Sequence, residues 1–416
     1  MTQKNTPDKF FYECIDCGKQ YDTSETKYLC PQCNKGNNDF NPPKGVLRIV
    51  YNFFKISQKN ILFKHLKEKN FLDLLPIKNL ASLPFLKVGN TPLYKLEELD
   101  HKKLPFKVLL KDDSQNPTFS FKDRASALVS AYAIENNQST LVTASTGNAG
   151  SSLAGICAAQ KQKAVIMVPE KAPLAKLTQI MMYGATIIPV KGTYDDAFEL
   201  SIQASEEFGW YNRNTAYNPL TIEGKKTVSF EIFDQLNQTL PDRIFVPVGD
   251  GVIISGVYKG FEDLLALGII SKIPTIVAVQ SEGSDNLTRN LDNKNFEVKK
   301  SNTIADSISV DIPRNFSMVK YFIQKYQGEY LTVSDQSILE SSRLLSQNTG
   351  IFAEPAAATG FAGLLHYNLH QKLDNNSNNV VLLTGSGLKD LNAVQSMLKM
   401  PDSIEPNIEN LKKMLS

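Results

Sequence analysis

From about residue 139 onward, short apolar runs alternate with longer stretches in which apolar residues recur at helical spacing. Strands are expected at residues 140–143, 164–168, 186–190, 243–248, 275–280 and 380–384, and helices at about 151–160, 172–183, 194–208 and from 255. Continuous apolar strands that alternate with helices are typical of parallel sheets covered on both faces. We therefore predict an α/β fold with doubly wound, mostly parallel sheets.

The composition is that of an ordinary globular protein. Of 416 residues, 42% are hydrophobic and 21% are charged, and 45 basic against 43 acidic side chains leave a net charge of +2. This balance excludes a disordered chain, and it argues against a protein held to DNA mainly by phosphate contacts. Because no apolar stretch has the length of a signal peptide or a membrane span, we expect a cytoplasmic protein with no membrane partner.

Four of the five cysteines form two close pairs near the start of the chain. Cys14 and Cys17 are separated by two residues, as are Cys30 and Cys33. Two such turns can place four thiolates around one tetrahedral ion, and four sulfur ligands leave no open position for water. We predict a structural zinc site, with a short hairpin within residues 19–29 and a linker at residues 34–45. Zinc ribbons also occur in nucleic-acid-binding proteins, but no basic stripe accompanies these cysteines.

Three loops that follow predicted strands carry candidate chemistry, because ligands of open α/β sheets lie beyond the carboxyl ends of the strands. The first loop has hydroxyls, an amide and glycines before a helix, which suits a carboxylate. The second is rich in glycine and suits a phosphate. The third places a hydroxyl after a buried strand. The loops are residues 145–150, 249–256 and 384–390.

One lysine is a candidate nucleophile. Lys122 lies between Phe121 and Asp123, close to a second aromatic residue, and a helix is expected from Ala125. Partial removal from water would lower the pKa of its amine and favour imine formation. A surface lysine paired with Asp123 is the alternative interpretation.

Together these segments resemble the threonine synthase family, pyridoxal-phosphate enzymes of the tryptophan-synthase-β structural type. The matching pieces are residues 89–93, 116–124, 145–150, 249–256 and 384–390. The resemblance implies two three-layer α/β domains that close over the cofactor. The larger would hold residues 46–135 and 236–416, the smaller residues 136–235, and residues 1–45 would form a zinc-ribbon-like module and linker.

The resemblance also implies a role for each candidate residue. Lys122 would be the catalytic residue and bind pyridoxal 5'-phosphate covalently. The other cofactor-binding residues would be Asn148, Gly249, Asp250, Gly251, Val252, Ile253 and Thr384, and the substrate-binding residues Ser145, Thr146, Gly147 and Asn148. The implied reaction of threonine biosynthesis converts O-phosphohomoserine and water to threonine and phosphate. Glu354 would lie nearby, and a homodimer is left open.

Two positions depart from the family pattern. Ala149 stands where a hydroxyl residue is common, and Thr221 where an arginine is common. Arg213, Lys225 or Lys226 are the candidate replacements for that arginine. The alternatives are β-replacement or β-elimination on another amino acid, as in cysteate synthase or serine and threonine dehydratases, or a metal-stabilised binding protein that has lost catalysis. Phe119, where the family usually has glycine, is expected to narrow the pocket.

Overall fold

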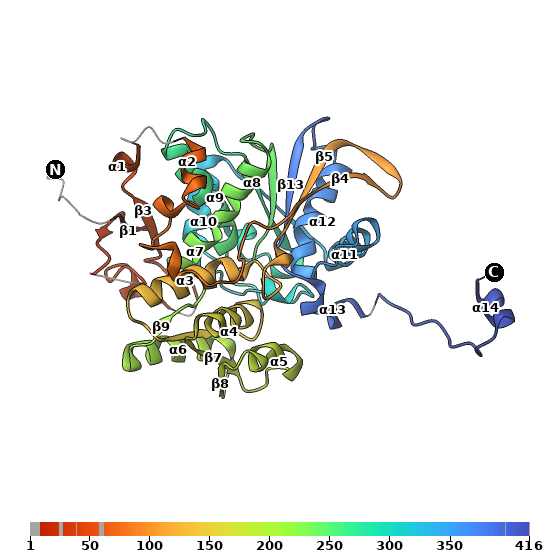
Figure 1. Cartoon of the computed structure of the whole chain (residues 1–416), viewed down its shortest axis with the longest axis horizontal. Helices are drawn as coiled ribbons and strands as arrows, with labels where there is room; N and C mark the ends of the chain where they lie inside the picture. Colours follow the sequence, from red (N-terminus) through yellow and green to blue (C-terminus); the bar gives the residue numbers. More distant parts are fainter. Residues whose placement is uncertain (1–8, 25–27, 39, 58–61, 396, 416) are drawn as a thin grey trace.

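The computed structural model describes residues 9–24, 28–38, 40–57, 62–395 and 397–415. These residues form two largely parallel sheets flanked by helices and one small antiparallel sheet (Figure 1). This architecture confirms the predicted α/β fold class.

The larger sheet has six strands in the order β12-β11-β10-β13-β5-β4. Their bounds are Glu329–Val333, Thr275–Ser281, Arg243–Pro247, Asn378–Leu383, Lys102–Asp112 and Leu93–Leu99. Only the edge strand β4 runs antiparallel, and the register pairs Pro247 with Val279 and Leu383 with Asp112. The carboxyl ends of β10, β13 and β5 therefore lie close together at one edge of the sheet.

Alternate residues of the central strands pack against helices on opposite faces. Ile244 and Val246 contribute to a core that contains apolar residues of α9 (Val252–Ala266), whereas Phe245 packs in a separate core with residues of α12 (Pro355–Leu369). This alternation follows from the period of two in a strand. The other helices around this sheet are α8 (Thr227–Gln235), α10 (Phe316–Tyr326) and α11 (Asp335–Thr349).

The smaller sheet has four parallel strands in the order β8-β7-β6-β9. Their bounds are Thr186–Val190, Lys163–Pro169, Thr140–Ala144 and Tyr211–Asn212. Helix α4 (Asn148–Gln160) packs with one face of this sheet and α6 (Tyr194–Phe208) with the other, while α5 (Leu174–Met182) contacts α4. Helix α3 (Lys122–Glu135) contacts both α4 and α7 (Leu220–Lys225).

The N-terminal strands β1 (Phe10–Cys14), β2 (Gln20–Tyr21) and β3 (Leu47–Tyr51) form the antiparallel sheet. β1 pairs with β2 across the first cysteine pair, so the hairpin lies earlier than the expected residues 19–29, of which 25–27 are outside the described residues. The remaining helices are α1 (Phe53–Ser57), α2 (Phe63–Glu68), α13 (Asn392–Gln395) and α14 (Ile408–Leu415), which ends a tail that extends from the body in Figure 1. Short 3₁₀ helices occur at Asn34–Gly36, Leu72–Leu74, Leu80–Ser82, Asp113–Gln115, Glu282–Ser284, Thr288–Asn290, Asp306–Ile308 and Gly387–Lys389.

Candidate active site

The lysine and two of the three predicted loops meet at one cavity of about 910 Å³. The predicted site residues that line it are Lys122, Ser145, Thr146, Gly147, Asn148, Gly249, Asp250, Gly251, Val252 and Ile253. The cavity therefore joins loops that follow β6 in the smaller sheet and β10 in the larger one. It lies at the carboxyl ends of these strands, as the sequence led us to expect.

Lys122 is the first residue of α3, three residues earlier than the expected helix start. The amide of Phe121 donates to the carbonyl of Thr384 at 2.9 Å, which ties the start of the helix to the end of β13. Burial, reinforced by the nearby Arg213 guanidinium, lowers the pKa of Lys122 to about 8, against the opposing effect of Asp250 and Glu354. A neutral, nucleophilic amine is therefore accessible near neutral pH.

The loop at residues 145–150 is shaped by a tight turn into α4. The amide of Gly147 donates to Ser145 Oγ at 3.2 Å. A Cβ atom on Gly150 would lie 2.4 Å from the Ser145 carbonyl oxygen, so only glycine allows this approach. Ser145, Thr146 and the start of α4 thus line one cavity, an arrangement of hydroxyl residues and a helix N-terminus that suits a carboxylate.

Asn148 contacts a buried carboxylate that the sequence placed near the site without a role. Asn148 Nδ2 donates to Glu354 Oε1 at 2.9 Å and lies 3.1 Å from Oε2. Burial raises the pKa of Glu354 to about 7, although Asn148, Lys389 and Lys122 act in the opposite direction. Gly385 makes room for this carboxylate, because a Cβ atom there would lie 2.4 Å from Glu354 Oε1.

The glycine loop at residues 249–253 joins β10 to α9. Gly251 has φ +86°, and its carbonyl accepts a hydrogen bond from Asn315 Nδ2 at 3.3 Å. The carboxylate of Asp250 accepts from the backbone amide of Arg314 at 3.1 Å, so it is engaged outside the loop. The first amides of α9 have no partner within the helix, which makes this loop a fitting cradle for a phosphate.

Thr384, the remaining predicted residue, is placed differently. It follows β13 and is buried, and its carbonyl is bound by Phe121. Among the described residues, the lining of the cavity does not include Thr384. This backbone contact is made to Phe121, the residue before the start of α3. The role of Thr384 as partner of the cofactor ring stays a prediction.

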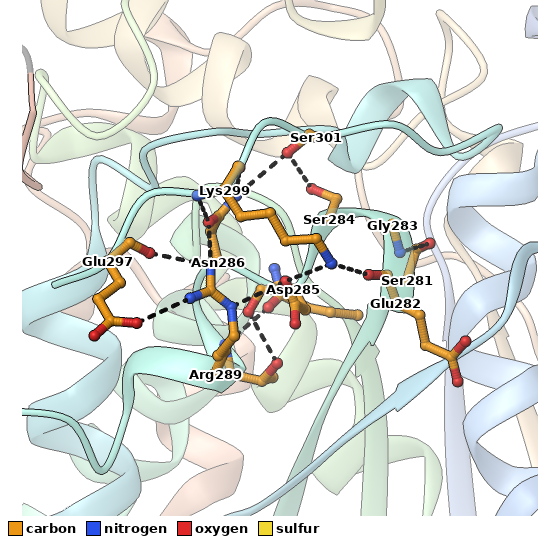
Figure 2. A network of polar contacts seen from close by, with 12 residues as sticks. Ser281, Glu282, Gly283, Ser284, Asp285, Asn286, Arg289, Glu297, Lys299 and Ser301 are labelled. Atoms are coloured by element: carbon orange, nitrogen blue, oxygen red, sulfur yellow. Dashed lines mark hydrogen bonds and ion pairs between the residues drawn. The ribbon is translucent and has the colours of Figure 1, made fainter.

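A network of polar contacts anchors one wall of the cavity (Figure 2). Asn286 and Lys299 exchange hydrogen bonds of 2.6 and 2.8 Å, and the Ser284 and Ser301 hydroxyls lie 3.0 Å apart. The amide of Val310 donates to Ser284 Oγ at 3.0 Å. These contacts fix the segment between β11 and α10, whose residues 306–312 line the cavity.

Of the three cations proposed to replace the family arginine, two have unsatisfied nitrogens. Lys225 and Arg213 are fully buried, and within the described chain Lys225 Nζ and Arg213 Nη2 have no hydrogen-bond partner. Lys226 instead contacts Glu223 at 2.5 Å and Asp263 at 2.6 Å. Thr221 is also engaged, because its hydroxyl donates to the Asn218 carbonyl at 2.8 Å.

The four predicted metal ligands, Cys14, Cys17, Cys30 and Cys33, form one cluster whose sulfurs all lie within 4.8 Å of one another. Two of the sulfur pairs are 3.9 Å apart. Zinc–sulfur bonds of about 2.3 Å in a tetrahedron require sulfurs about 3.8 Å apart. The residues therefore fit a tetrahedral ion.

One wall of the cavity was not predicted from the sequence. Residues expected to be a linker line it, among them Asn34, Asn37, Asn38 and Asn41. Asn37 closes this loop, since its side chain contacts Asn34 Oδ1 at 2.7 Å and the Lys44 backbone at 2.8 and 3.1 Å. The run of asparagines was the only signal in the sequence. Phe119, which was expected to narrow the pocket, has φ +69°, is 48% exposed and is not among the described residues that line it.

Comparison with known proteins defines the class. The family model described as "Pyridoxal-phosphate dependent enzyme" matches residues 85–385. The fold is shared with a threonine deaminase from T.th., with a TM-score of 0.62 and 26% identity over 72% of this chain and 92% of that one. Maize serine racemase has a TM-score of 0.64 and 24% identity over 74% and 92% of the two chains.

Curated relatives narrow this class further. Threonine synthase of Methanocaldococcus jannaschii is 36% identical over 97% of this chain and 98% of its own length. Threonine synthase of Halalkalibacterium halodurans is 34% identical over 82% and 94% of the two chains. The chain belongs to the pyridoxal-phosphate dependent enzymes and, within them, to the threonine synthase family. Within the described part of the chain, no helix is long and apolar enough to cross a membrane.

Proposed function

We propose that the protein is a threonine synthase that converts O-phosphohomoserine and water to threonine and phosphate. The observation that carries this proposal is the shared cavity, in which Lys122 meets a loop suited to a carboxylate and a loop suited to a phosphate. Unpaired cations beside Lys122 support a substrate with a further anionic group.

The described residues fit pyridoxal phosphate. Lys122 would hold it, the backbone of residues 249–253 would bind its phosphate, Asn148 would face its ring hydroxyl and Thr384 its ring nitrogen. When bound, the cofactor supplies an electron sink for negative charge that develops on the substrate carbons.

Substrate binding and proton transfer would be carried out by residues of this protein. Ser145, Thr146, Gly147 and Asn148 would hold the substrate carboxylate and so orient the reacting carbons. The Lys122 amine, whose pKa is about 8, would move protons at the α, β and γ carbons. Walls from both sheets and the N-terminal loop would keep bulk water from the site.

The second candidate is β-replacement or β-elimination on another amino acid. It is favoured by the two departures from the family pattern, because Ala149 has no hydroxyl and the Thr221 hydroxyl is bound to Asn218. Solved structures that share the fold include a threonine deaminase and a serine racemase, which act on amino acids without a phosphoryl group by their printed names.

We also propose the metal, the domain boundaries, the location and the oligomeric state of the enzyme. Zinc would be the ion of the four-cysteine cluster, and residues 136–235 would form the smaller, closing domain. A cytoplasmic location agrees with the free cysteines. A homodimer and a place in amino-acid biosynthesis complete the proposal.

The test is threonine and phosphate formation from O-phosphohomoserine by the cofactor-loaded enzyme. We expect both products in equal amounts, and we expect Lys122→Ala to abolish turnover while the protein stays folded. Product formation from O-phosphoserine or serine but not from O-phosphohomoserine would establish the second candidate instead. Substantial threonine formation by Lys122→Ala would overturn the role of this lysine.

A further inference from the structure

The buried cations of the described chain divide into two groups. Lys111, Arg124, Lys226 and Lys259 each contact at least one carboxylate, at distances such as 2.7 Å from Lys111 to Glu231 and 2.6 Å from Lys226 to Asp263. Lys225 and Arg213 contact none, and each retains a nitrogen with no hydrogen-bond partner. These two residues are the exception to the rule that buried charges are paired.

Both exceptions lie directly behind the wall of the cavity. Arg213 Nη1 donates to Thr215 Oγ1 at 3.0 Å, and Thr215 lines the cavity. Lys225 packs against α9, since a Cβ atom on Gly256 would lie 2.6 Å from Lys225 Cβ. The preceding residues of α9, Ile253 and Ile254, also line the cavity.

Arg213 acts electrostatically on both Lys122 and Lys225. Burial, then Arg213 and Lys122, lower the pKa of Lys225 well below its ordinary value, with Asp250 in opposition. Burial also lowers the pKa of Arg213 to about 10. Burial and the neighbouring groups thus disfavour the charged form of these side chains in the ligand-free protein, and a bound dianion would favour it.

The glycine loop is the proposed cradle for the cofactor phosphate, so these two side chains point to a second anionic group. Lys225 lies four residues after Thr221, on the same face of α7. Because the Thr221 hydroxyl is already bound to Asn218, Lys225 is the residue on this face that could become charged when an anion binds.

We propose that Lys225 and Arg213 form the receptor for the phosphoryl group of the substrate, a phosphate monoester dianion. This inference rests on the proposed function for the identity of the substrate. The Lys225 ammonium would rotate from its buried position toward the cavity, and Arg213 would offer its free Nη2. The site would accept phosphorylated amino acids and discriminate against those with an uncharged side chain.

The test measures binding to the cofactor-loaded enzyme by calorimetry, with inorganic phosphate and a phosphonate isostere of O-phosphohomoserine as probes. We expect Lys225→Gln and Arg213→Gln each to weaken both probes by about 10- to 100-fold, the range for loss of a charge-assisted hydrogen bond. The affinity for pyridoxal phosphate and for the non-phosphorylated isostere norvaline should stay within about twofold. Lys163→Gln, which removes a charge from an exposed lysine, is the control.

Stability gives a second readout. Ligand-free Lys225→Gln should melt at or above the wild-type temperature because it removes an unpaired buried amine. Lys226→Gln should melt lower because it removes the cation that contacts Glu223 and one of the two lysines that contact Asp263. Unchanged phosphate affinity in both Lys225→Gln and Arg213→Gln would overturn the proposal. Weakened pyridoxal phosphate binding with unchanged phosphonate binding would overturn it as well and assign the pair to the cofactor.

These outcomes are separable from failure of the proposed function. The wild type could make no threonine but still bind inorganic phosphate in a manner that depends on Lys225. The anion receptor would then be supported, and O-phosphohomoserine would be rejected as the substrate. If the wild type makes threonine while the Lys225 and Arg213 variants bind both probes normally, the proposed reaction is supported and the proposed phosphoryl receptor is rejected.

Discussion

At the scale of single residues, Glu354 is a side chain strongly altered by its surroundings that has no role in the reaction we propose. Its carboxyl is bound by Asn148 and lies under Gly385. Its pKa rises from the ordinary 4.5 to about 7 because burial disfavours the charged form. Between these values the folded protein holds a proton that the unfolded chain has released. The stability that Glu354 provides is therefore complete below about pH 4.5 and is lost as the pH rises through 7.

Glu354→Gln should remove this pH dependence, because glutamine is neutral at every pH. We expect the ligand-free variant to exceed the wild-type free energy of unfolding at pH 8 by up to about 3 kcal/mol, and the difference to shrink toward zero at about pH 5. Urea unfolding at both pH values measures this. Glu68→Gln, which changes an exposed residue, is the control. The same difference at pH 5 and pH 8 would contradict the raised pKa.

The residue scale is also where prediction from sequence was least complete. The sequence identified Lys122 and the cavity loops by their residue types, and it named Arg213, Lys225 and Lys226 as equivalent candidates. Only the structure separates them, because the pairing of Lys226 with Asp263 depends on how α7 packs against α9. Charge compensation between segments distant in sequence has no local signature.

At the scale of elements, the glycine loop and the start of α9 depend on close backbone contact. A Cβ atom on Gly249 would lie 2.9 Å from Ile308 Cα and 3.3 Å from Ile308 C. Gly249→Ala would therefore displace the backbone of the segment that carries Ser307. We expect at least about a tenfold loss of pyridoxal phosphate affinity and a loss of about 1–3 kcal/mol in the free energy of unfolding.

Spectroscopic titration of the apoenzyme with pyridoxal phosphate, together with urea unfolding, measures both losses. Gly36→Ala is a matched control, because a Cβ atom there meets nothing within 4 Å. A wild-type affinity of Gly249→Ala for pyridoxal phosphate would contradict this prediction, because it would show that the loop can move away from Ile308 without weakening cofactor binding.

Strand positions were the most predictable elements. The expected strand at residues 186–190 coincides with β8, and the expected helix at 194–208 coincides with α6. Helix starts at the site were placed three residues late, at 125 instead of 122 and at 255 instead of 252. Candidate site residues lie at both places. Lys122 begins α3, and Gly249 and Gly251 directly precede α9, so the sequence there indicates a loop.

At the scale of the whole molecule, the four-cysteine module connects the two larger units. The Tyr28 ring stacks on Tyr217 with centroids 4.5 Å apart, and its hydroxyl accepts from the Asn212 amide in β9 at 3.0 Å. On the other side, Glu13 in β1 of the module lies 2.5 Å from Arg48 in β3, which in turn lies 3.5 Å from Glu262 in α9. The module therefore contacts both units that enclose the cavity, in addition to supplying part of its lining.

Loss of the metal should for this reason affect both stability and substrate binding. With all four cysteines changed to serine, we expect a lower melting temperature and a KM for O-phosphohomoserine raised about 5- to 20-fold, equivalent to one or two lost hydrogen bonds in the cavity wall. The kcat should stay within about threefold, because Lys122 and the glycine loop are held by contacts outside the module.

Asn37→Ala separates the two effects, because Asn37 closes the lining loop without contributing a sulfur ligand. This variant should retain its metal and nearly all of its stability, yet show the same rise in KM. Metal content by elemental analysis, thermal melting and steady-state kinetics measure the three quantities. A wild-type KM in Asn37→Ala would limit the module to a structural role. A large fall in kcat in folded, cofactor-loaded cysteine variants would instead show that the metal site positions the reacting groups themselves.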